Sequence, residues 1–240
     1  MAASSPAAIR AASSGRSGSN SSPWRPSKVV GTAANAADSG PTGLLDFQRR
    51  RKEDSRERLL ASATEAFCAR GYFAVSVEDI ASAAAISRMT FYRHFSGKAA
   101  IAAELFRRNS RAEMPHLLAI RDQDWRDRLV VTDWIAGQFA SDRAQRQLLR
   151  VFSAANVDEP TFTEAGHRFI ADMIAGLGEA IPAFAADPER DRRRWVEAWL
   201  LLYEIFDQGN HAARDSGVAT DPLTIEILAD RFIRFVGEAG

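Results

Sequence analysis

The segment from Ser87 to Lys98, SRMTFYRHFSGK, contains the residue types that proteins use to contact nucleic acid. Arg88 can present two parallel donors to a guanine edge, and Thr90 can offer a methyl group to thymine or a hydroxyl to phosphate. Lys98 would meet a phosphate where the backbone N–H groups of a following helix also point. The spacing of these side chains predicts one face that contacts DNA.

Two short helices are predicted to position this face. Ser76 and Asp79 form an S-x-x-D capping box that begins the first helix, and Ser87 caps the second. Phe91 and Phe95, four residues apart, share the inner face of the second helix. The opposite face carries the polar side chains Arg88, Thr90, Arg93 and His94. This arrangement predicts a helix-turn-helix whose second helix enters the major groove.

Over residues 56–105 the chain resembles the TetR family of transcriptional regulators. The order and spacing of several short motifs support the resemblance: residues 59–67, Arg70-Gly71-Tyr72, residues 77–81, Ile86-Ser87, residues 91–95 and Gly97-Lys98. The family usually has glycine at Ala85 and an acidic residue at Ala99. We therefore expect Ala85 to take the left-handed turn conformation at a small energetic cost.

The resemblance implies an all-helical, homodimeric DNA-binding repressor. It implies that Tyr92 and His94 contact backbone phosphates or flanking bases. The full set of expected DNA contacts is Ser76, Ser87, Arg88, Thr90, Tyr92, Arg93, His94 and Lys98. It further implies a small-molecule effector enclosed by the rest of the chain, and a palindromic operator as the DNA partner.

Composition indicates an ordinary globular protein. The chain has 240 residues, 46% of them hydrophobic, and its single cysteine, Cys68, excludes an internal disulfide framework. Cys68 lies on the apolar side of its predicted helix and is expected to be a small core residue. No apolar run reaches the length of a membrane-spanning helix, so we expect a cytoplasmic protein without membrane contact.

The net charge of zero conceals an asymmetry along the chain. Residues 49–108 contain twelve Lys/Arg and seven Asp/Glu, whereas residues 109–240 contain fifteen and twenty-two. A basic segment followed by an acidic one suits a DNA-binding head joined to a body that avoids DNA.

Three regions are expected: a disordered tail over 1–48, a helix-turn-helix domain over 49–97, and a ligand-binding and dimerisation domain over 98–240. The tail is rich in Ala, Ser, Gly and Pro, and too poor in large apolar residues to fold. It is a dispensable tail or overlong translation start, or it adds weak phosphate contacts; its acid-poor, Arg/Ser-rich start also resembles a transit peptide. The basic run 49–52 is either a solvated segment or an arm that grips phosphate.

Helical periodicity and breakers predict an all-α fold of about nine helices. The first is expected to span residues 54–70 and to end at Gly71, and the helix after Lys98 is expected to stop before Pro115. Further helices are predicted over residues 124–139, 143–155, 161–181, 188–214 and 222–238.

Catalytic arrangements are weak in this sequence. The lone Gly176-Leu177-Gly178 follows no strand, and His116, His167 and His211 show no metal-ligand spacing. We therefore expect neither an enzyme nor a metal or cofactor site. The alternatives that remain are a ligand-independent DNA-binding regulator, and a helical small-molecule-binding or catalytic protein with a vestigial helix-turn-helix.

The last two predicted helices are candidates for a dimer interface. Residues 198–206 are apolar almost all round, so this helix is either wholly buried in its own subunit or meets a partner. The family resemblance implies a four-helix interface from such a terminal pair, with Leu201, Ile205, Leu228, Phe232 and Phe235 as the expected contacts. For Glu204 and Asp207, an interfacial salt bridge with Arg231 or Arg234 is favoured over the alternative, a role in ligand binding.

A second set of large side chains could line an effector cavity in the body: Trp125, Trp134, Phe139, Phe152, Phe169, Met173 and Trp199. Aromatic residues at helical spacing form a core more often than a pocket, so both interpretations stay open. If they line a cavity, an apolar or aromatic effector is favoured.

Overall fold

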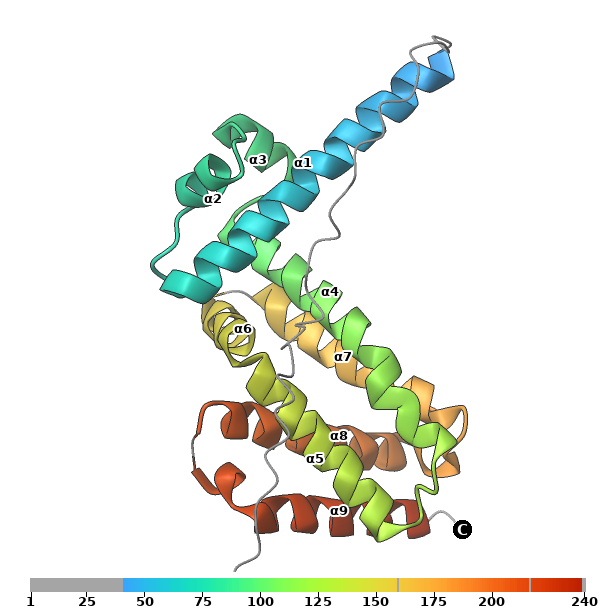
Figure 1. Cartoon of the computed structure of the whole chain (residues 1–240). Coiled ribbons are helices and arrows are strands. Elements are labelled where there is room, and N and C mark those ends of the chain that lie inside the picture. The colour runs from blue at the N-terminus through green and yellow to red at the C-terminus, as the bar shows by residue number, and fades with distance from the viewer. Residues whose placement is uncertain (1–40, 159, 216, 239–240) are drawn as a thin grey trace, which may run out of the picture. The chain divides into compact units, whose positions relative to one another are not determined.

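The computed structural model describes residues 41–158, 160–215 and 217–238. Within these ranges the protein contains only helices, which confirms the predicted all-α fold (Figure 1). The described α-helices are α1 (Pro41–Arg70), α2 (Val77–Ala83), α3 (Arg88–His94), α4 (Lys98–Leu118), α5 (Arg128–Ala144), α6 (Arg146–Asp158), α7 (Pro160–Gly178), α8 (Arg192–Ala213) and α9 (Pro222–Gly237). Short 3-10 helices span Ala119–Asp122, Pro182–Phe184 and Gly217–Thr220.

Helix α1 begins at Pro41, thirteen residues before the predicted start. The boundary of the expected tail at residue 48 is therefore wrong, and residues 1–40 lie outside the described part of the chain. The basic run at 49–52 belongs to this helix and does not precede it as an extended arm. Strong helix formers and ion pairs such as Arg49–Asp46 (3.1 Å) favour the longer helix.

Helix α4 also continues further than predicted, through Pro115 to Leu118. Pro115 lies in the last turn, where its missing N–H removes a single helical hydrogen bond. Leu117 is fully buried, with 1% of its surface exposed, and its packing favours the extra turn.

Side-chain caps move the starts of two body helices away from the predicted positions. Asp127 caps α5 by accepting from the Leu129 amide, and Asp191 caps α8 by accepting from the Arg194 amide. The expected starts at 124 and 188 were thus several residues early. Helix α7 ends at Gly178, before the predicted 181.

The head is built on a buried cluster shared by α1, α2, α3 and the start of α4. Phe67, Ile80 and Phe91 are all at most 1% exposed, and Phe95 packs 5.9 Å from Phe91 between ring centroids. The prediction that Phe91 and Phe95 form the inner face of α3 is confirmed. Cys68 is half-buried, and burial raises the pKa of its thiol.

Two left-handed residues shape the head. Gly71 has φ 84° and ends α1, as expected for a glycine terminator. Ala85, in the turn between α2 and α3, has φ 52°. The sequence prediction for Ala85 is therefore confirmed. The left-handed conformation is slightly strained for alanine because of its Cβ, which glycine lacks.

The body has its own apolar core, in which α5 packs against both α8 and α9, and α4 packs against α7. Helix α4 takes part in both cores: Ile101 and Leu105 lie in the head cluster, whereas Leu117 lies in the body cluster. The head cluster also includes Phe152 and Phe162 of α6 and α7. The described residues all belong to one compact unit, so the division at 97/98 stays a prediction.

None of the helices in the described ranges is both long and apolar enough to cross a membrane.

Candidate nucleic-acid interface and body cavity

The two serines expected at the DNA face hold the amino-terminal ends of their helices. Ser76 Oγ accepts a hydrogen bond from the Asp79 amide (3.1 Å), and an Asp79 carboxylate oxygen accepts one from the Ser76 amide (2.9 Å). Ser87 Oγ accepts from the Thr90 amide (3.2 Å) and donates to Thr90 Oγ1 (3.0 Å). The predicted capping box and second cap are confirmed. DNA contact by either serine stays a prediction.

Arg88 stands at the first position of α3 and is largely exposed. Its guanidinium lies 2.8 Å from the Glu78 carboxylate and 5.6 Å from the centre of the Tyr92 ring. Interaction with Tyr92 and the charge of Glu78 raise the pKa of Arg88. Thus α2 and α3 together orient this side chain at the surface, where it remains accessible to a partner.

The remaining polar side chains of α3 lie on its outer side. Tyr92 and Arg93 are exposed, whereas His94 is half-buried. His94 Nε2 lies 3.0 Å from Ser55 Oγ on α1. Burial, followed by the positive charges of Lys52, Arg93 and Arg56, lowers the pKa of His94. His94 is therefore neutral near pH 7 and joins α3 to α1.

Lys98 lies at the first position of α4 but reaches back toward the turn after α1. Its Nζ donates to the Tyr72 carbonyl (3.0 Å) and lies 4.3 Å from the centre of the Tyr72 ring. The side chain is half-buried. Lys98 therefore connects the start of α4 to the turn after α1 and stabilises the head. Contact between its ammonium group and a DNA phosphate stays a prediction.

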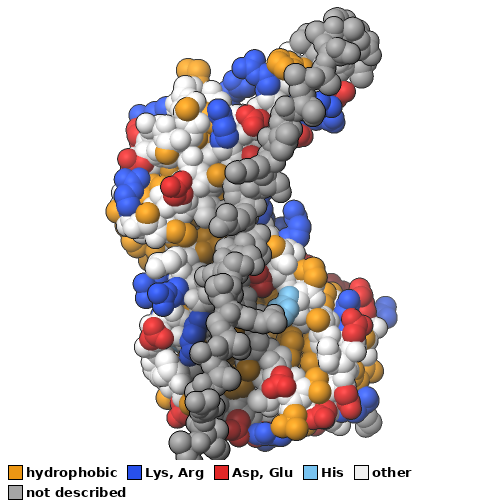
Figure 2. Space-filling model, viewed as in Figure 1, with side chains coloured by type: hydrophobic (Ala, Val, Ile, Leu, Met, Phe, Trp, Pro, Cys, Tyr) orange, Lys and Arg blue, Asp and Glu red, His pale blue; other side chains and the backbone are white. Residues whose placement is uncertain are grey.

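An open groove of about 850 Å³ lies between the amino-terminal half of α1 and the start of α3. Its lining includes Ser87, Thr90, Arg93 and His94 from the expected DNA face. Helix α1 adds the basic side chains Arg49, Arg51, Lys52 and Arg58. Asp54 is the lone acid among the described lining residues, so the groove is strongly positive. Lys and Arg side chains are visible beside the upper end of α1 in Figure 2.

Sequence reasoning missed Arg58 as a member of this groove. The sequence prediction placed residues 49–52 before the helix, so it could not show that they share a helical face with Arg58. Once α1 is known to begin at Pro41, helical spacing places Arg51, Lys52, Ser55 and Arg58 near one another.

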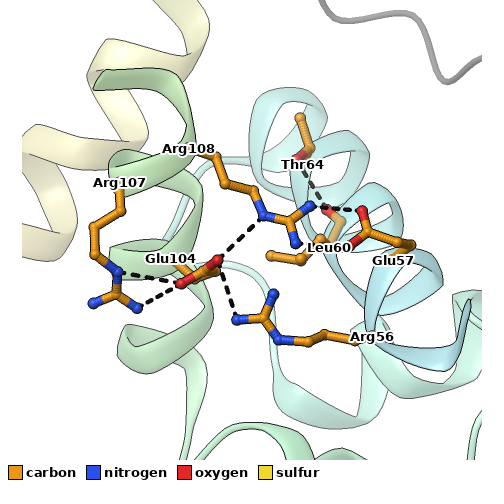
Figure 3. A network of polar contacts seen from close by, with 7 residues as sticks. All are labelled: Arg56, Glu57, Leu60, Thr64, Glu104, Arg107 and Arg108. Carbon is orange, nitrogen blue, oxygen red and sulfur yellow. Dashed lines mark hydrogen bonds and ion pairs between the residues drawn. The ribbon is translucent and has the colours of Figure 1, made fainter. Parts of the chain in front are cut away.

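A network of ion pairs links α1 to α4 (Figure 3). Arg108 donates two hydrogen bonds of 2.6 Å to Glu57. Arg108 and Arg56 also contact the Glu104 carboxylate at 3.2 and 3.1 Å, and Arg107 contacts it at 2.7 Å. The hydrogen bond from Arg108 lowers the pKa of Glu57. Burial opposes ionisation of Glu104, but its three arginine partners keep the pKa of Glu104 below its usual value. The head is thereby fixed to the linking helix.

A partly enclosed cavity of about 300 Å³ lies among α4, α5, α6, α7 and α8. Of the seven predicted lining residues, Phe152 and Phe169 line it. The other aromatic walls are Phe106, Phe162, Tyr203 and Phe206, which the sequence did not single out.

The other five predicted residues lie outside this cavity lining and pack instead against neighbouring side chains. Trp134 packs on Phe232 (5.6 Å between ring centroids) and donates its indole N–H to the Leu117 carbonyl (3.2 Å). Trp199 stacks on Tyr203 at 4.9 Å. Phe139 and Met173 are almost fully buried in the body core, and Trp125 packs against it. Periodicity could not separate these core positions from cavity positions, because both lie on inward faces.

Buried polar side chains form one wall of the cavity. Gln138 and Asp142, one turn apart on α5, are 5% and 7% exposed. Gln138 Nε2 donates to Asp142 Oδ1 (2.9 Å), while Gln138 Oε1 and Asp142 Oδ2 have no hydrogen-bond partner within the described ranges. Burial, aided by the charge of Glu113, raises the pKa of Asp142 to about 7. No local pattern in the sequence indicates this pair, because its burial depends on the positions of other helices.

The five residues expected at the dimer interface are all buried within a single chain. Leu201, Ile205, Leu228, Phe232 and Phe235 are between 0% and 8% exposed. The Glu204–Arg231 ion pair also forms within one chain, rather than between subunits as expected. Helices α8 and α9 nevertheless expose large apolar side chains: Leu200, Tyr203, Leu223 and Ile227.

The arrangement of α1 to α4, with a polar exposed face on α3, defines a helix-turn-helix protein with an attached α-helical body. The model for bacterial regulatory proteins of the tetR family matches residues 59–105. In this head the chain is therefore similar to regulators of the TetR family.

Individual proteins are similar to this chain as well. The chain is 36% identical over 73 residues to the HTH-type transcriptional activator FasR of Mycolicibacterium smegmatis. The match covers 30% of this chain and 33% of FasR, so the chain spans about a third of the length of this relative.

Two solved structures share the fold. GusR of Salmonella enterica has a TM-score of 0.54 and 20% identity, over 76% of this chain and 95% of GusR. FadR of Thermus thermophilus, a TetR-family repressor solved with lauroyl-CoA, has a TM-score of 0.53 and 18% identity, over 77% and 94% of the two chains.

Proposed function

We propose that this protein is a cytoplasmic, homodimeric transcriptional repressor that binds a palindromic operator and leaves it when a small molecule occupies the body. The observation that carries the proposal is the exposed polar face of α3, where Arg88, Tyr92 and Arg93 surround a well-capped helix start. A helix presented in this way fits the major groove, with its amino-terminal residues at the base edges.

The positive groove beside α3 supports the same function. Arg49, Arg51 and Lys52 of α1 lie on the side of the groove opposite Thr90 and Arg93. Basic side chains on both sides of a reading helix suit the two phosphate strands that border a major groove. Base reading by α3 and phosphate contact by α1 would therefore act together.

Control by a small molecule is supported by the position of α4. Glu104 and Arg108 of this helix hold the head, whereas Phe106, Asn109 and Glu113 line the body cavity. A ligand that shifts α4 would therefore move the head of its own subunit. The ligand must prefer the DNA-incompetent arrangement, with a coupling free energy of roughly 1–3 kcal/mol if it is typical. The lauroyl-CoA complex of the FadR repressor supports a ligand-holding body in this fold.

Dimerisation is supported by the exposed apolar side chains Leu200, Tyr203, Leu223 and Ile227 of α8 and α9. A two-fold dimer through these helices would present two copies of α3. Two recognition helices about one DNA turn (~34 Å) apart read a palindrome, so a change of a few ångströms in their spacing releases one half-site.

Selection from a pool of random duplex DNA tests the function directly. The purified full chain should enrich a palindromic sequence, and its affinity for that sequence should fall steeply as the salt concentration rises. Failure to enrich any sequence over random duplex would overturn the proposal. If DNA binding is found but no small molecule changes it, the protein is a ligand-independent regulator.

A further inference from the structure

The body cavity combines aromatic walls with three acidic side chains, of which Asp142 is buried. Phe106, Phe152, Phe162, Phe169 and Phe206 supply the aromatic surface. Glu113, Asp142 and Asp207 supply three carboxylates. Its volume of about 300 Å³ is at the lower end of the range for small-molecule sites.

Two of these carboxylates have no cation beside them in the described part of the chain. Glu113 accepts hydrogen bonds from Gln145 Nε2 (2.8 Å) and Ser141 Oγ (3.3 Å), both neutral donors. Asp142 accepts one bond, from Gln138. A buried carboxylate without a positive partner is strongly unfavourable, and a second carboxylate nearby makes it more so.

The arginine and histidine side chains near the cavity contact groups other than Glu113 and Asp142. Arg214 is the single Lys or Arg among the described lining residues, and its Nε–H is donated to the Asn210 carbonyl (3.2 Å). Asp207 lies 3.7 Å from His211. His167 lies against the Trp199 ring, with 5.5 Å between centroids. None of these groups neutralises the Glu113–Asp142 side of the cavity.

The second carboxyl oxygen of Asp142 has no hydrogen-bond partner among the described residues. Its Oδ2 faces Gly209 of α8 so closely that a Cβ on Gly209 would lie 2.3 Å from it. Gln138 Oε1 is also unpaired, although Gln138 is only 5% exposed. This side of the cavity thus carries the carboxyl groups of Glu113 and Asp142 without a cation beside them among the described residues.

We infer that the cavity binds an organic cation, a protonated amine or amidinium attached to an aromatic or aliphatic group, with its charged end toward Glu113 and Asp142. The apolar part would lie against the phenylalanines, whose ring faces also attract cations. This inference rests on the proposal that the body cavity is the effector site, and it specifies the chemical class of the effector.

Three probes of similar size and different charge test the inference on the full chain: 4-phenylbutylamine, 4-phenylbutan-1-ol and 4-phenylbutyrate. Isothermal titration calorimetry at pH 7.5 should show the amine binding at least about tenfold more tightly than the alcohol, and the carboxylate binding most weakly. Glu113→Gln should reduce the preference for the amine over the alcohol. Asp133→Asn, an exposed acid on the same helix as Asp142, should leave that preference unchanged.

The inference is overturned if the three probes bind equally, if the carboxylate binds most tightly, or if none binds. It is also overturned if a Glu113→Gln/Asp142→Asn double variant keeps the full preference for the amine. The three-probe comparison uses the unaltered protein, so its outcome does not depend on the folding of any variant. Selection of operator DNA by the same preparation is independent of these results, so failure of the cation inference would be distinguishable from failure of the regulatory function.

Discussion

The Arg88 guanidinium is held at the start of α3 by the Glu78 carboxylate and the Tyr92 ring, yet its side chain is 64% exposed. Such a side chain is oriented before DNA arrives and can exchange one surface ion pair for two bonds to a guanine. An exposed ion pair contributes little stability, so the exchange costs little. Arg88 is thus free to read a base, whereas Ser76, Ser87 and Lys98 make contacts that hold the head together.

Replacing Arg88 by alanine should weaken binding to the selected operator by about 1–3 kcal/mol and relax specificity at one position of each half-site. Fluorescence anisotropy with the operator and with its single-base variants would measure both effects. Arg193→Ala, on the strongly exposed start of α8, is the matched control and should bind like the unaltered protein. Equal losses on operator and random DNA would mean that Arg88 does not read a base.

Asp142 leads to a prediction about stability. Its pKa is raised to about 7, mainly by burial, so the folded protein binds a proton that the unfolded chain releases near pH 4. The free energy of unfolding therefore falls as the pH rises from about 4 to 7, because over this range the unfolded chain loses the proton that Asp142 keeps in the folded protein. Asp142→Asn should be more stable than the unaltered protein by about 2–4 kcal/mol at pH 8, with a difference that shrinks toward pH 4.

Urea unfolding of the variant and of the unaltered protein at a series of pH values checks this prediction. The other carboxylates titrate alike in both proteins, so their effects cancel in the difference between the two free energies of unfolding. Asp133→Asn, at an exposed position of the same helix, should give a small difference that does not vary with pH. A constant difference between Asp142→Asn and the unaltered protein would contradict the assigned pKa.

At the scale of elements, α1 and α4 have double roles. Helix α1 forms part of the head core through Leu59, Leu60 and Phe67, and its amino-terminal half adds a basic wall to the groove beside α3. Helix α4 joins the head to the cavity. The ion-pair network of Glu57, Glu104 and Arg108 fixes these two helices to each other, so a shift of α4 is transmitted to the head.

The basic wall of α1 should contribute affinity without specificity. Changing Arg49, Arg51 and Lys52 together to alanine should flatten the slope of log affinity against log salt by about 2–3 units, because up to three phosphate contacts are lost. The preference for operator over random DNA should remain. A double Arg192→Ala/Arg193→Ala variant on α8 is the control, and an unchanged slope in the α1 variant would place this helix away from DNA.

At the scale of the whole molecule, α8 and α9 carry both buried and exposed large apolar side chains. Phe232 and Ile205 are fully buried within one chain, so they stabilise the body itself. Leu200 and Ile227 are 55% and 44% exposed and remain available to a second copy. Exposed large apolar side chains gathered on two helices are typical of a protein interface.

A charge on the exposed part of this surface should therefore separate the subunits without unfolding them. Leu200→Glu/Ile227→Glu should give a folded monomer with helical circular dichroism and a nearly unchanged melting temperature, measured beside light scattering. Leu129→Glu, at an exposed position of α5, should remain dimeric. A charge at Phe232 should instead unfold the body, because a buried charge without a partner is strongly unfavourable. If the unaltered protein is a monomer at micromolar concentration, this assembly is wrong.

The sequence by itself determined the features that depend on near neighbours in the chain. The Ser76–Asp79 capping box, the cap at Ser87, the turn at Ala85 and the inward pair Phe91 and Phe95 each follow from residues within about four positions. The helix-turn-helix and the all-α fold are therefore predictable from local patterns of residues.

Only the tertiary structure decided which inward-facing side chains surround a cavity and which fill a core. Trp134 and Phe169 both lie at helical spacing among apolar neighbours, yet one packs on Phe232 and the other lines the cavity. The buried Gln138–Asp142 pair likewise depends on where α4, α7 and α8 come to lie. Helical periodicity fixes the face on which a residue stands. What that face meets is set by contacts between segments far apart in the chain, and these are formed only when the helices pack.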